Sequence, residues 1–368
     1  MDASISTADG QARAAGRAAA AAVRDLYPGY FAFVMATGII STGTFLLGPS
    51  WLSHVLLAAT VAGLVVLTVA LAARIAFFRS AVAADLRAPQ RVFGFFTITA
   101  GIDVLGVRLA TAGHPLVTAV LAAVSAIVWL LLTYGVPAAL LCTRAQDSAL
   151  PVNGTWLLWV VATQSLSLAA AALVQTWPSQ RELLAPAAAG LWSVGLGLYV
   201  LIVSLILLRL TNPMTPTSNL GPAYWILMGA TAITVLAGVR IVGLSPAIPL
   251  IRITAGFIEG SCFALWAFGT WWIPLLMVTG LWQHYSRHGH LHYEPTLWSA
   301  VFPLGMYSVA TLLYGKAAHL AFMEPIARFM LWVSVAAWVL LAGAFLVRLA
   351  IRRPTRVSGT PDGPGAAS

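Results

Sequence analysis

Long apolar runs, almost free of charged residues, occupy most of this chain and limit what it can fold into. The first run, residues 28–48 (PGYFAFVMATGIISTGTFLLG), has no charge and is long enough to cross a bilayer as a helix. Of the 368 residues, 60% are hydrophobic and only 8% are charged, and the mean hydropathy is +0.88. A typical soluble domain has about three times that share of charged residues. The sequence therefore predicts an all-α membrane protein that crosses the bilayer many times.

A second feature is a pattern that recurs along the chain. Segments that begin with an aromatic residue and become small or hydroxylated within about two helical turns start at Phe31, Phe95, Trp156, Trp225 and Trp298. The starts are 64, 61, 69 and 73 residues apart, which is about the length of two spanning helices with their loops. Small and hydroxyl residues suit a helix that packs closely on others or lines a polar path. The recurrence predicts five helical hairpins.

Ten transmembrane helices are expected from the apolar runs. Their predicted ranges are 29–47, 51–77, 93–110, 115–142, 152–174, 185–209, 222–242, 251–283, 296–315 and 326–350. Pro274 and Pro303 lie inside the eighth and ninth helices, where a missing backbone hydrogen bond bends the helix. We thus expect one transmembrane transporter domain, 28–350, between a cytoplasmic N-terminal tail, 1–27, and a disordered cytoplasmic C-terminal tail, 351–368.

The distribution of basic residues predicts the orientation in the membrane. Fourteen arginines lie in segments on the side of the two termini, and six arginines or lysines lie on the other side. Because cytoplasmic loops are enriched in Lys and Arg, both termini are expected in the cytoplasm, and the membrane is expected to be the plasma (inner) membrane. The net charge of +9 comes from residues scattered at the ends of apolar runs, so nucleic-acid binding is not predicted.

No set of residues predicts catalysis, a cofactor or a resident metal, so the chain is not expected to be an enzyme. Cys142 and Cys262 lie in apolar surroundings and match no zinc or disulfide spacing. No serine–histidine–aspartate set, phosphate loop or HExxH motif occurs. Four histidines between the eighth and ninth helices leave two interpretations open, a solvated loop, which composition favours, and a metal site. They are His284, His288, His290 and His292.

Charged residues inside the predicted helices are rare, which makes them candidate functional residues. Asp103 and Glu259 fall in the third and eighth helices, near the depth of Arg108 and Arg240. Buried charges are normally paired, so ion pairs between these acids and arginines are the favoured interpretation. The alternative is proton coupling, because a buried carboxyl group can take up a proton together with an anionic substrate.

Neutral polar and small residues on the odd-numbered helices are the candidates for a path across the membrane. If these helices form an inner ring, their hydroxyl and amide groups can bond a passing solute, and basic residues near the mouths favour anions. Threonine in a spanning helix also often bonds its own backbone, so that each single assignment stays open. The candidate lining residues are Thr37, Gly38, Thr99, Thr163, Gln164, Thr231, Pro303, Gly305 and Ser308.

Several segments resemble a known family. They are PGYFAFVMATGIIS from Pro28, NGTWLLWVVATQS from Asn153, PAYWILMGATAIT from Pro222, FGTWWIPLL from Phe268 and LWSAVFPLGMYSVAT from Leu297. The chain resembles the tellurite-resistance/dicarboxylate transporter family, which includes TehA-type channels, malic acid permeases, sulfite exporters and slow anion channels. The resemblance implies ten helices as five hairpins around a central pore, odd helices inside and even helices outside, and commonly a homotrimer.

The resemblance also implies that a phenylalanine on a proline-kinked inner helix closes the pore. Phe302, directly before Pro303, is the residue carried over for this gate, and Phe96 in the third helix is the second candidate. The chain departs from the family pattern in two ways. Its third helix has no proline, so a bend there must come from a glycine. Asp103 would also place an acid in an anion path if it faced inward.

Together these features predict transmembrane transport of small anions through a phenylalanine-gated pore. C4-dicarboxylates such as malate are the leading substrate class. The alternatives are an exporter or channel for sulfite, chloride or related inorganic anions, proton-coupled dicarboxylate uptake, and, from a different class, a non-transporting receptor or assembly subunit. The lipid bilayer and a small anionic substrate are the expected partners, and no residue predicts handling of tellurite.

Overall fold

The computed structural model describes residues 16–143, 152–211, 221–245, 248–286 and 295–351, and these residues contain helices and short connections but no strand. Nine of the helices in these ranges are long and apolar enough to cross a membrane. A further helix, α11 (Trp298–Ala317), has spanning length but is more polar, because tyrosine, proline, serine and glycine residues are spread along it. The expectation of an all-α membrane protein is confirmed.

Five of the helices are entered through a short 3-10 turn and form the inner layer. They are α2 (Ala32–Leu47), α5 (Phe96–Thr111), α7 (Leu157–Thr176), α9 (Ile226–Val242) and α11, with the turns η1 (Pro28–Phe31), η2 (Val92–Phe95), η3 (Gly154–Trp156), η6 (Pro222–Trp225) and η7 (Pro295–Leu297) before them. The recurring aromatic residues of the sequence lie at these entrances. A proline opens three of the turns, where its fixed φ and missing N–H suit the start of a helix.

The other long helices form an outer layer. They are α3 (Ser50–Phe77), α6 (Pro115–Thr143), α8 (Arg181–Thr211), α10 (Pro249–Ser286) and α12 (Met323–Ile351). The predicted ranges agree with these bounds within about one helical turn, and the largest differences are earlier starts of the outer helices. The first described residues, 16–24, are helical, whereas the predicted C-terminal tail and the loop histidines lie outside the part whose side chains are described.

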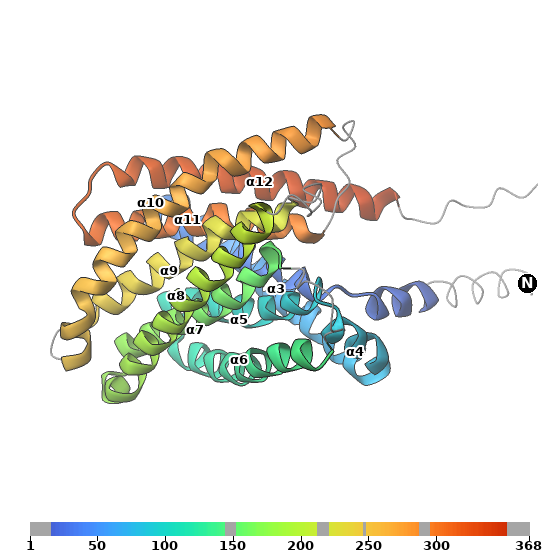
Figure 1. Cartoon of the computed structure of the whole chain (residues 1–368), viewed down its shortest axis with the longest axis horizontal. Helices are drawn as coiled ribbons and strands as arrows, with labels where there is room; N and C mark the ends of the chain where they lie inside the picture. The colour runs from blue at the N-terminus through green and yellow to red at the C-terminus, as the bar shows by residue number, and fades with distance from the viewer. Residues whose placement is uncertain (1–15, 144–151, 212–220, 246–247, 287–294, 352–368) are drawn as a thin grey trace, which may run out of the picture.

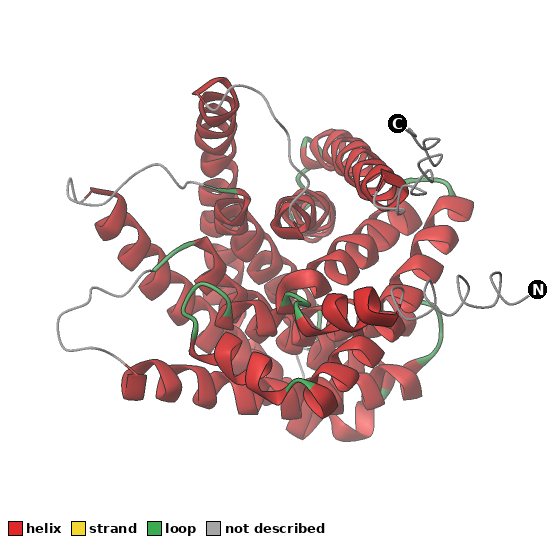
Figure 2. Ribbon diagram, turned by 90° about the vertical axis from the view of Figure 1, so that its right-hand side faces the viewer, coloured by secondary structure: helices red, strands yellow, loops and turns green. Residues whose placement is uncertain are grey.

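The inner helices form a closed ring. Each packs against the outer helix that follows it in the chain, and inner contacts run from α2 to α5, α7, α9, α11 and back to α2. The helices run along the long axis of the molecule, and residues 16–24 lie at the same end as the last turn of α12 (Figure 1). Viewed from that end, helices surround the centre on all sides (Figure 2). The inner helices therefore all begin at the end where the chain starts and finishes.

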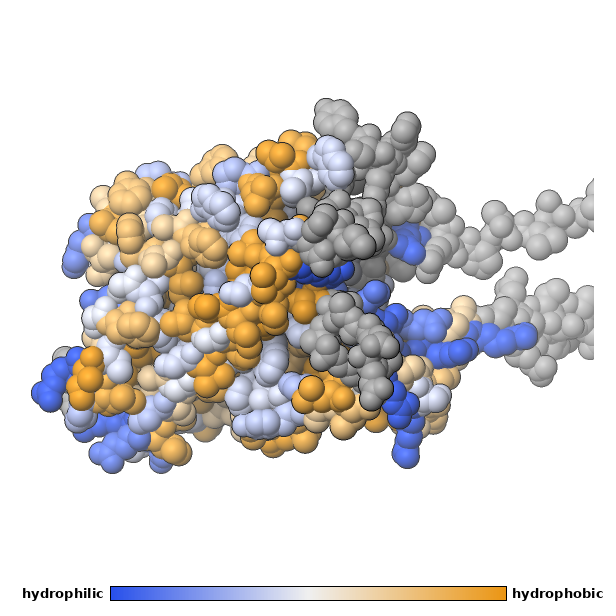
Figure 3. Space-filling view, in the orientation of Figure 1, coloured by the Kyte–Doolittle hydropathy of each residue, from blue (hydrophilic) through white to orange (hydrophobic). Residues whose placement is uncertain are grey.

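Burial separates the two layers. In the inner spans 72–89% of the residues are buried, against 11–33% in the outer spans. The outer helices expose large apolar side chains such as Leu131, Leu208 and Leu340, each about 70% exposed. On the face in Figure 3, hydrophobic residues cover the middle and hydrophilic residues gather at the two ends. Such a surface suits the acyl chains of a bilayer.

An additional short helix, α4 (Arg79–Arg87), follows α3 at the end where the chain starts, where the sequence predicts only a connection. Val82 and Leu86 pack against the apolar side of α3, α5 and α6, while its basic residues lie toward the outside. This helix is too short and too polar to span a membrane. It is a surface helix that holds the base of the first two hairpins together.

A buried ion-pair cluster fixes α4 in place. The Asp85 carboxylate lies 2.8 Å from an Arg74 nitrogen and 2.7 Å from an Arg91 nitrogen. The Arg74 side chain is only 2% exposed, and its Nε donates to the carbonyl of Arg24 at 2.9 Å. Arg91 also lies over the ring of Tyr27, and burial raises the pKa of that phenol above its ordinary value. The cluster joins α3, α4 and the segment before α2.

We expect Asp85→Ala to lower the free energy of unfolding by about 3–5 kcal/mol, because it leaves the Arg74 guanidinium buried without a counter-charge. Thermal unfolding of the purified protein in detergent measures the effect as a lower Tm. Glu324→Ala is the control, because the pair of Glu324 with Arg328, at 3.0 Å, is exposed and worth about 0–1 kcal/mol. Equal Tm values for the two variants would contradict the role given to Asp85.

Candidate functional site at the ring axis

A small cavity lies on the axis of the ring, in the half of the bundle away from the chain ends. Its volume is about 20 Å³, which is room for about one water molecule. All five inner helices contribute to its wall through residues in their later turns. The lining residues are Ile39, Thr42, Val104, Val107, Thr111, Leu168, Leu236, Arg240, Met306, Val309 and Leu313.

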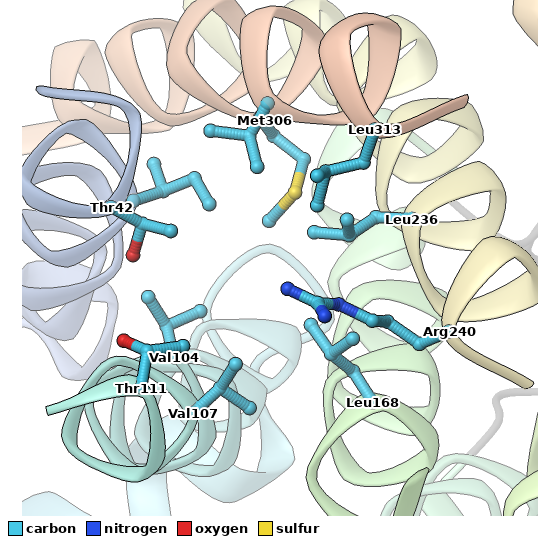
Figure 4. A pocket seen from close by; sticks show the side chains of 11 residues that line it. Thr42, Val104, Val107, Thr111, Leu168, Leu236, Arg240, Met306 and Leu313 are labelled. Carbon is cyan, nitrogen blue, oxygen red and sulfur yellow. The ribbon is translucent and has the colours of Figure 1, made fainter. Parts of the chain in front are cut away.

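Arg240 is the charged residue in this wall. It belongs to the last turn of α9, and its guanidinium points to the centre of the cavity, on the side opposite Thr42 and Thr111 (Figure 4). Among the residues that the structure describes, no hydrogen bond or ion pair involves the Arg240 side chain. A guanidinium offers five N–H donors in a planar fork that matches a carboxylate. The cavity therefore holds a free cationic donor.

The rest of the lining is largely apolar. Ile39, Val104, Leu168, Leu236 and Met306 place one apolar side chain from each inner helix around the axis. A narrow apolar segment opposes the passage of a hydrated ion, because nothing there replaces the water that the ion must lose. The largely apolar wall therefore opposes the passage of hydrated ions at the level of the cavity.

A second cation lies behind the cavity wall. Arg108, in the last turn of α5, is 1% exposed and donates to the hydroxyls of Ser53, at 3.0 Å, and Thr111, at 3.3 Å. Its guanidinium lies 4.3 Å from the ring centroid of Phe45. Thr111 also lines the cavity, so Arg108 is separated from the axis by one side chain. Both arginines contribute positive potential to this end of the ring.

The two acids do not pair with these arginines, contrary to the favoured expectation. Asp103 is 1% exposed, and its Oδ2 accepts a hydrogen bond from Ser165 of α7 at 2.8 Å. Glu259 is exposed on α10 and lines a pocket outside the ring. Within the described ranges neither carboxylate forms an ion pair. Asp103 and Arg108 are five residues apart, which on an α-helix directs them to different neighbours.

The two candidate gate residues lie in different surroundings. Phe302 is 1% exposed and lies one turn before Met306, so the two side chains share a face of α11. Met306 points into the cavity (Figure 4). The helix spacing places Phe302 on the same side of α11, one turn nearer the chain ends. Phe96 instead stacks against Phe93 and Trp159, with centroids 6.1 and 6.0 Å away. The gating role of either phenylalanine stays a prediction.

Most polar residues that the sequence suggests for the path are bonded elsewhere. The hydroxyls of Thr37 and Thr163 accept the indole N–H groups of Trp338 and Trp129 on outer helices, both at 2.9 Å. The remaining bonds run from Gln164 to the carbonyl of Trp192, from Ser308 to that of Ala327 and from Thr231 to that of Met228. Thr99 Oγ1 is buried and has no partner among the described residues. None of these side chains is in the cavity wall given above.

The small residues of the prediction serve close packing. A Cβ at Gly38 would lie 2.9 Å from a Val104 methyl, and one at Gly305 would lie 3.0 Å from Ile39 and Ile40 side-chain atoms. Pro303 packs against Gly229 of α9, where a Cβ would lie 2.8 Å from the proline ring. Such contacts let inner helices approach one another directly. The apolar residues of the cavity wall are absent from the sequence-based candidates, because nothing in an apolar helix distinguishes a side chain at the axis from one packed between helices.

A closed ring of buried helices, surrounded by lipid-facing helices and holding an unpaired arginine on its axis, defines a polytopic membrane protein of the channel or transporter class. Residues 25–346 match the voltage-dependent anion channel family, and the chain belongs to this family. Membership makes it an anion transporter or channel. The family match covers most of the chain and includes every helix that contributes to the axis cavity.

Individual relatives have names that agree with this class. A Methanocaldococcus jannaschii protein named an uncharacterized transporter is 26% identical over 332 residues, 86% of this chain and 92% of the relative. A second uncharacterized transporter of that organism is 27% identical over 148 residues, 40% of this chain and 42% of the relative. A Mycobacterium tuberculosis H37Rv protein named an uncharacterized membrane protein is 47% identical over 154 residues, 42% of this chain and 77% of the relative.

We expect Thr37→Val to lower the free energy of unfolding by about 1–3 kcal/mol, because the indole N–H of Trp338 then lacks its acceptor between two layers. The measurement is the Tm of purified protein in detergent. The matched control is Thr211→Val, because Thr211 is exposed and bonds only its own helix, to Leu207 and Leu208. An unchanged Tm in Thr37→Val would show that the hydroxyl is not needed between the layers.

Proposed function

We propose that the protein carries small anions across the plasma (inner) membrane along the axis of its ring. The observation that carries this proposal is the Arg240 guanidinium, which points into a cavity lined by all five inner helices. Membership of the voltage-dependent anion channel family supports it. C4-dicarboxylates such as malate are the substrate class that we place first, and sulfite, chloride and related inorganic anions follow.

Arg240 would act on the passing ion in two ways. Its charge raises the local concentration of anions and lowers that of cations at the cavity. Its N–H donors replace part of the water that a carboxylate or an inorganic anion loses on entering an apolar segment. Arg108, one side chain further from the axis, would add to the potential without contacting the ion.

Phe302 would close the path on the side of the chain ends. Its ring lies one turn from Met306, so the two side chains form successive apolar barriers on α11. Pro303 removes a backbone hydrogen bond next to Phe302, which makes this turn of the helix easier to bend. Opening would then need only side-chain rotation and a local bend, while the ring as a whole stays in place.

Both termini would lie in the cytoplasm. Arg74, Arg79, Arg87 and Arg91 gather around α4 at the end of the bundle where the chain starts and where α12 finishes. An excess of arginine on one side marks the cytoplasmic face. Assembly as a homotrimer with one path per subunit is also part of the proposal, and the apolar outer faces of α3, α6, α8, α10 and α12 provide surface for it.

Flux of malate, sulfite and chloride into liposomes that hold the purified protein, under an imposed voltage, tests this function. We expect Arg240→Gln to lower anion flux about tenfold, equivalent to about 1.4 kcal/mol, and Phe302→Ala to raise it by a similar factor. Arg328→Gln is the control, because Arg328 is an exposed arginine at the same end that pairs with Glu324. Wild-type flux in Arg240→Gln would contradict the axial path, and absence of flux in wild type and Phe302→Ala would favour a receptor or assembly subunit.

A second candidate, proton-coupled uptake, is favoured by the hydrogen bonding of Asp103. The Ser165 hydroxyl lies 2.8 Å from Asp103 Oδ2 and 2.9 Å from the carbonyl oxygen of Ala162. A hydroxyl has one proton to donate. When the hydroxyl donates to the carbonyl of Ala162, a protonated Asp103 can donate its own proton to Ser165. When the hydroxyl donates to Asp103, an ionised Asp103 accepts that hydrogen bond. The geometry therefore accommodates both protonation states.

If Asp103 carries the coupled proton, Asp103→Asn will abolish malate uptake driven by an imposed pH gradient while retaining flux driven by voltage. The same liposomes measure both quantities. Glu259→Gln is the control, because Glu259 lies outside the ring and should leave both unchanged. Uptake in Asp103→Asn that still follows the pH gradient would remove this candidate, and wild-type flux that follows voltage alone would leave a simple channel.

A further inference from the structure

A larger pocket lies on the side of the bundle, outside the ring. It has a volume of about 430 Å³ and is formed by the end of α9, the first half of α10 and the turn after α11. Its lining residues are Val239, Val242, Glu259, Gly260, Cys262, Phe263, Tyr314, Ala317, Ala318 and His319. The helix α9 separates it from the axis cavity, because Arg240 faces the axis while its neighbours Val239 and Val242 face this pocket.

Glu259 gives this pocket an unpaired negative charge. It lies ten residues into α10, about 15 Å along a spanning helix, and is exposed to the pocket mouth. None of the ion pairs in the described parts of the chain includes it. A carboxylate beside apolar surface is costly unless a cation accompanies it. No ion pair among the described residues supplies that cation, so the pocket is suited to a cation from outside the chain.

The other walls of the pocket are suited to an amphiphile. Val239, Val242 and Phe263 provide apolar surface, and the Phe263 ring is 49% exposed beside the bilayer-facing side of α10. Gly260 leaves space at the wall, since a Cβ there would meet nothing within 4 Å. One turn beyond Phe263 along α10, the rings of Trp266 and Phe322 meet edge to face at 6.3 Å. An acyl chain can therefore run along α10 while a headgroup lies by Glu259.

One basic residue accompanies the acid in the pocket wall. His319, in the turn after α11, lines the pocket and is exposed. A metal ion is a poor fit, because the described residues contain no group of three or more His, Cys, Asp or Glu that could ligate one. An acid and a histidine in one pocket instead match a zwitterion that carries an ammonium and a phosphate.

We propose that this lateral pocket binds a phospholipid with a primary ammonium in its headgroup. Glu259 accepts hydrogen bonds from the ammonium, His319 donates to the phosphate, and the acyl chains lie along Phe263 and the outer face of α10. The pocket volume is within the range of small-molecule sites, about 300–1,000 Å³. The proposal goes beyond anion passage, and its test does not measure flux.

Native mass spectrometry of the purified, delipidated protein with phosphatidylethanolamine, phosphatidylcholine and phosphatidylglycerol of equal acyl length tests the proposal. We expect phosphatidylethanolamine to bind about tenfold more tightly than the other two. Phosphatidylcholine has a methylated ammonium without N–H donors, and phosphatidylglycerol has no ammonium. Glu259→Gln should remove the preference. Gly260→Leu should also remove it, by filling the pocket without changing the charge and without a clash in the folded protein.

Glu324→Gln is the matched control and should keep the preference, because Glu324 is an exposed acid at the same end that already pairs with Arg328. Equal binding of the three lipids, or a preference that survives Glu259→Gln, would overturn the proposal. Dodecylamine provides the final comparison, because it carries a primary ammonium without a phosphate. If dodecylamine binds as tightly as phosphatidylethanolamine, the phosphate contacts contribute nothing and the lipid assignment fails.

Discussion

Inside a bilayer a polar group has no water to bond, so each one must find a partner within the protein or face a hydrated path. The hydrogen bonds between the two helix layers follow from this requirement. The indole N–H groups of Trp129 and Trp338 in the outer layer donate to threonines of the inner layer. Trp159 in the inner layer donates to Thr133 in the outer layer. These contacts hold α6 and α12 at a fixed rotation while the other side of each helix faces lipid.

The same requirement explains why the axis has so few polar groups. Hydroxyls on the inner helices are used for the layer contacts and for their own backbone, so they do not accumulate at the centre. The cavity on the axis is left with mostly apolar side chains, two threonines and one guanidinium. Because no fixed acid competes for that guanidinium, an arriving anion finds its donors free. Weak binding through one residue is compatible with rapid release.

The sequence predicts the helices well, because apolar runs of bilayer length have few other uses. It misses α4, whose nine residues are too polar for a span and are fixed by tertiary ion pairs to Arg74 and Arg91. The direction of side chains on the inner helices cannot be predicted from the sequence. These helices are apolar or small on all sides, so no periodic pattern indicates that Thr37 faces the outer layer and Met306 the axis. The separation of Asp103 from Arg108 does follow from the sequence, because residues five apart on an α-helix point in different directions.

The direction of the inner helices has an electrostatic consequence. All five begin at the same end of the bundle, so their peptide dipoles add instead of cancelling, each contributing about half a positive charge at that end and half a negative charge at the other. Arg108, Arg240 and Lys316 occupy the last turns of α5, α9 and α11, where the negative ends gather. The backbone thus supplies the counter-charge that the acidic side chains do not. An anion at the opposite mouth meets the positive ends of these peptide dipoles in addition to the arginines around α4, and no side-chain substitution can remove the part of the field that the peptide groups make.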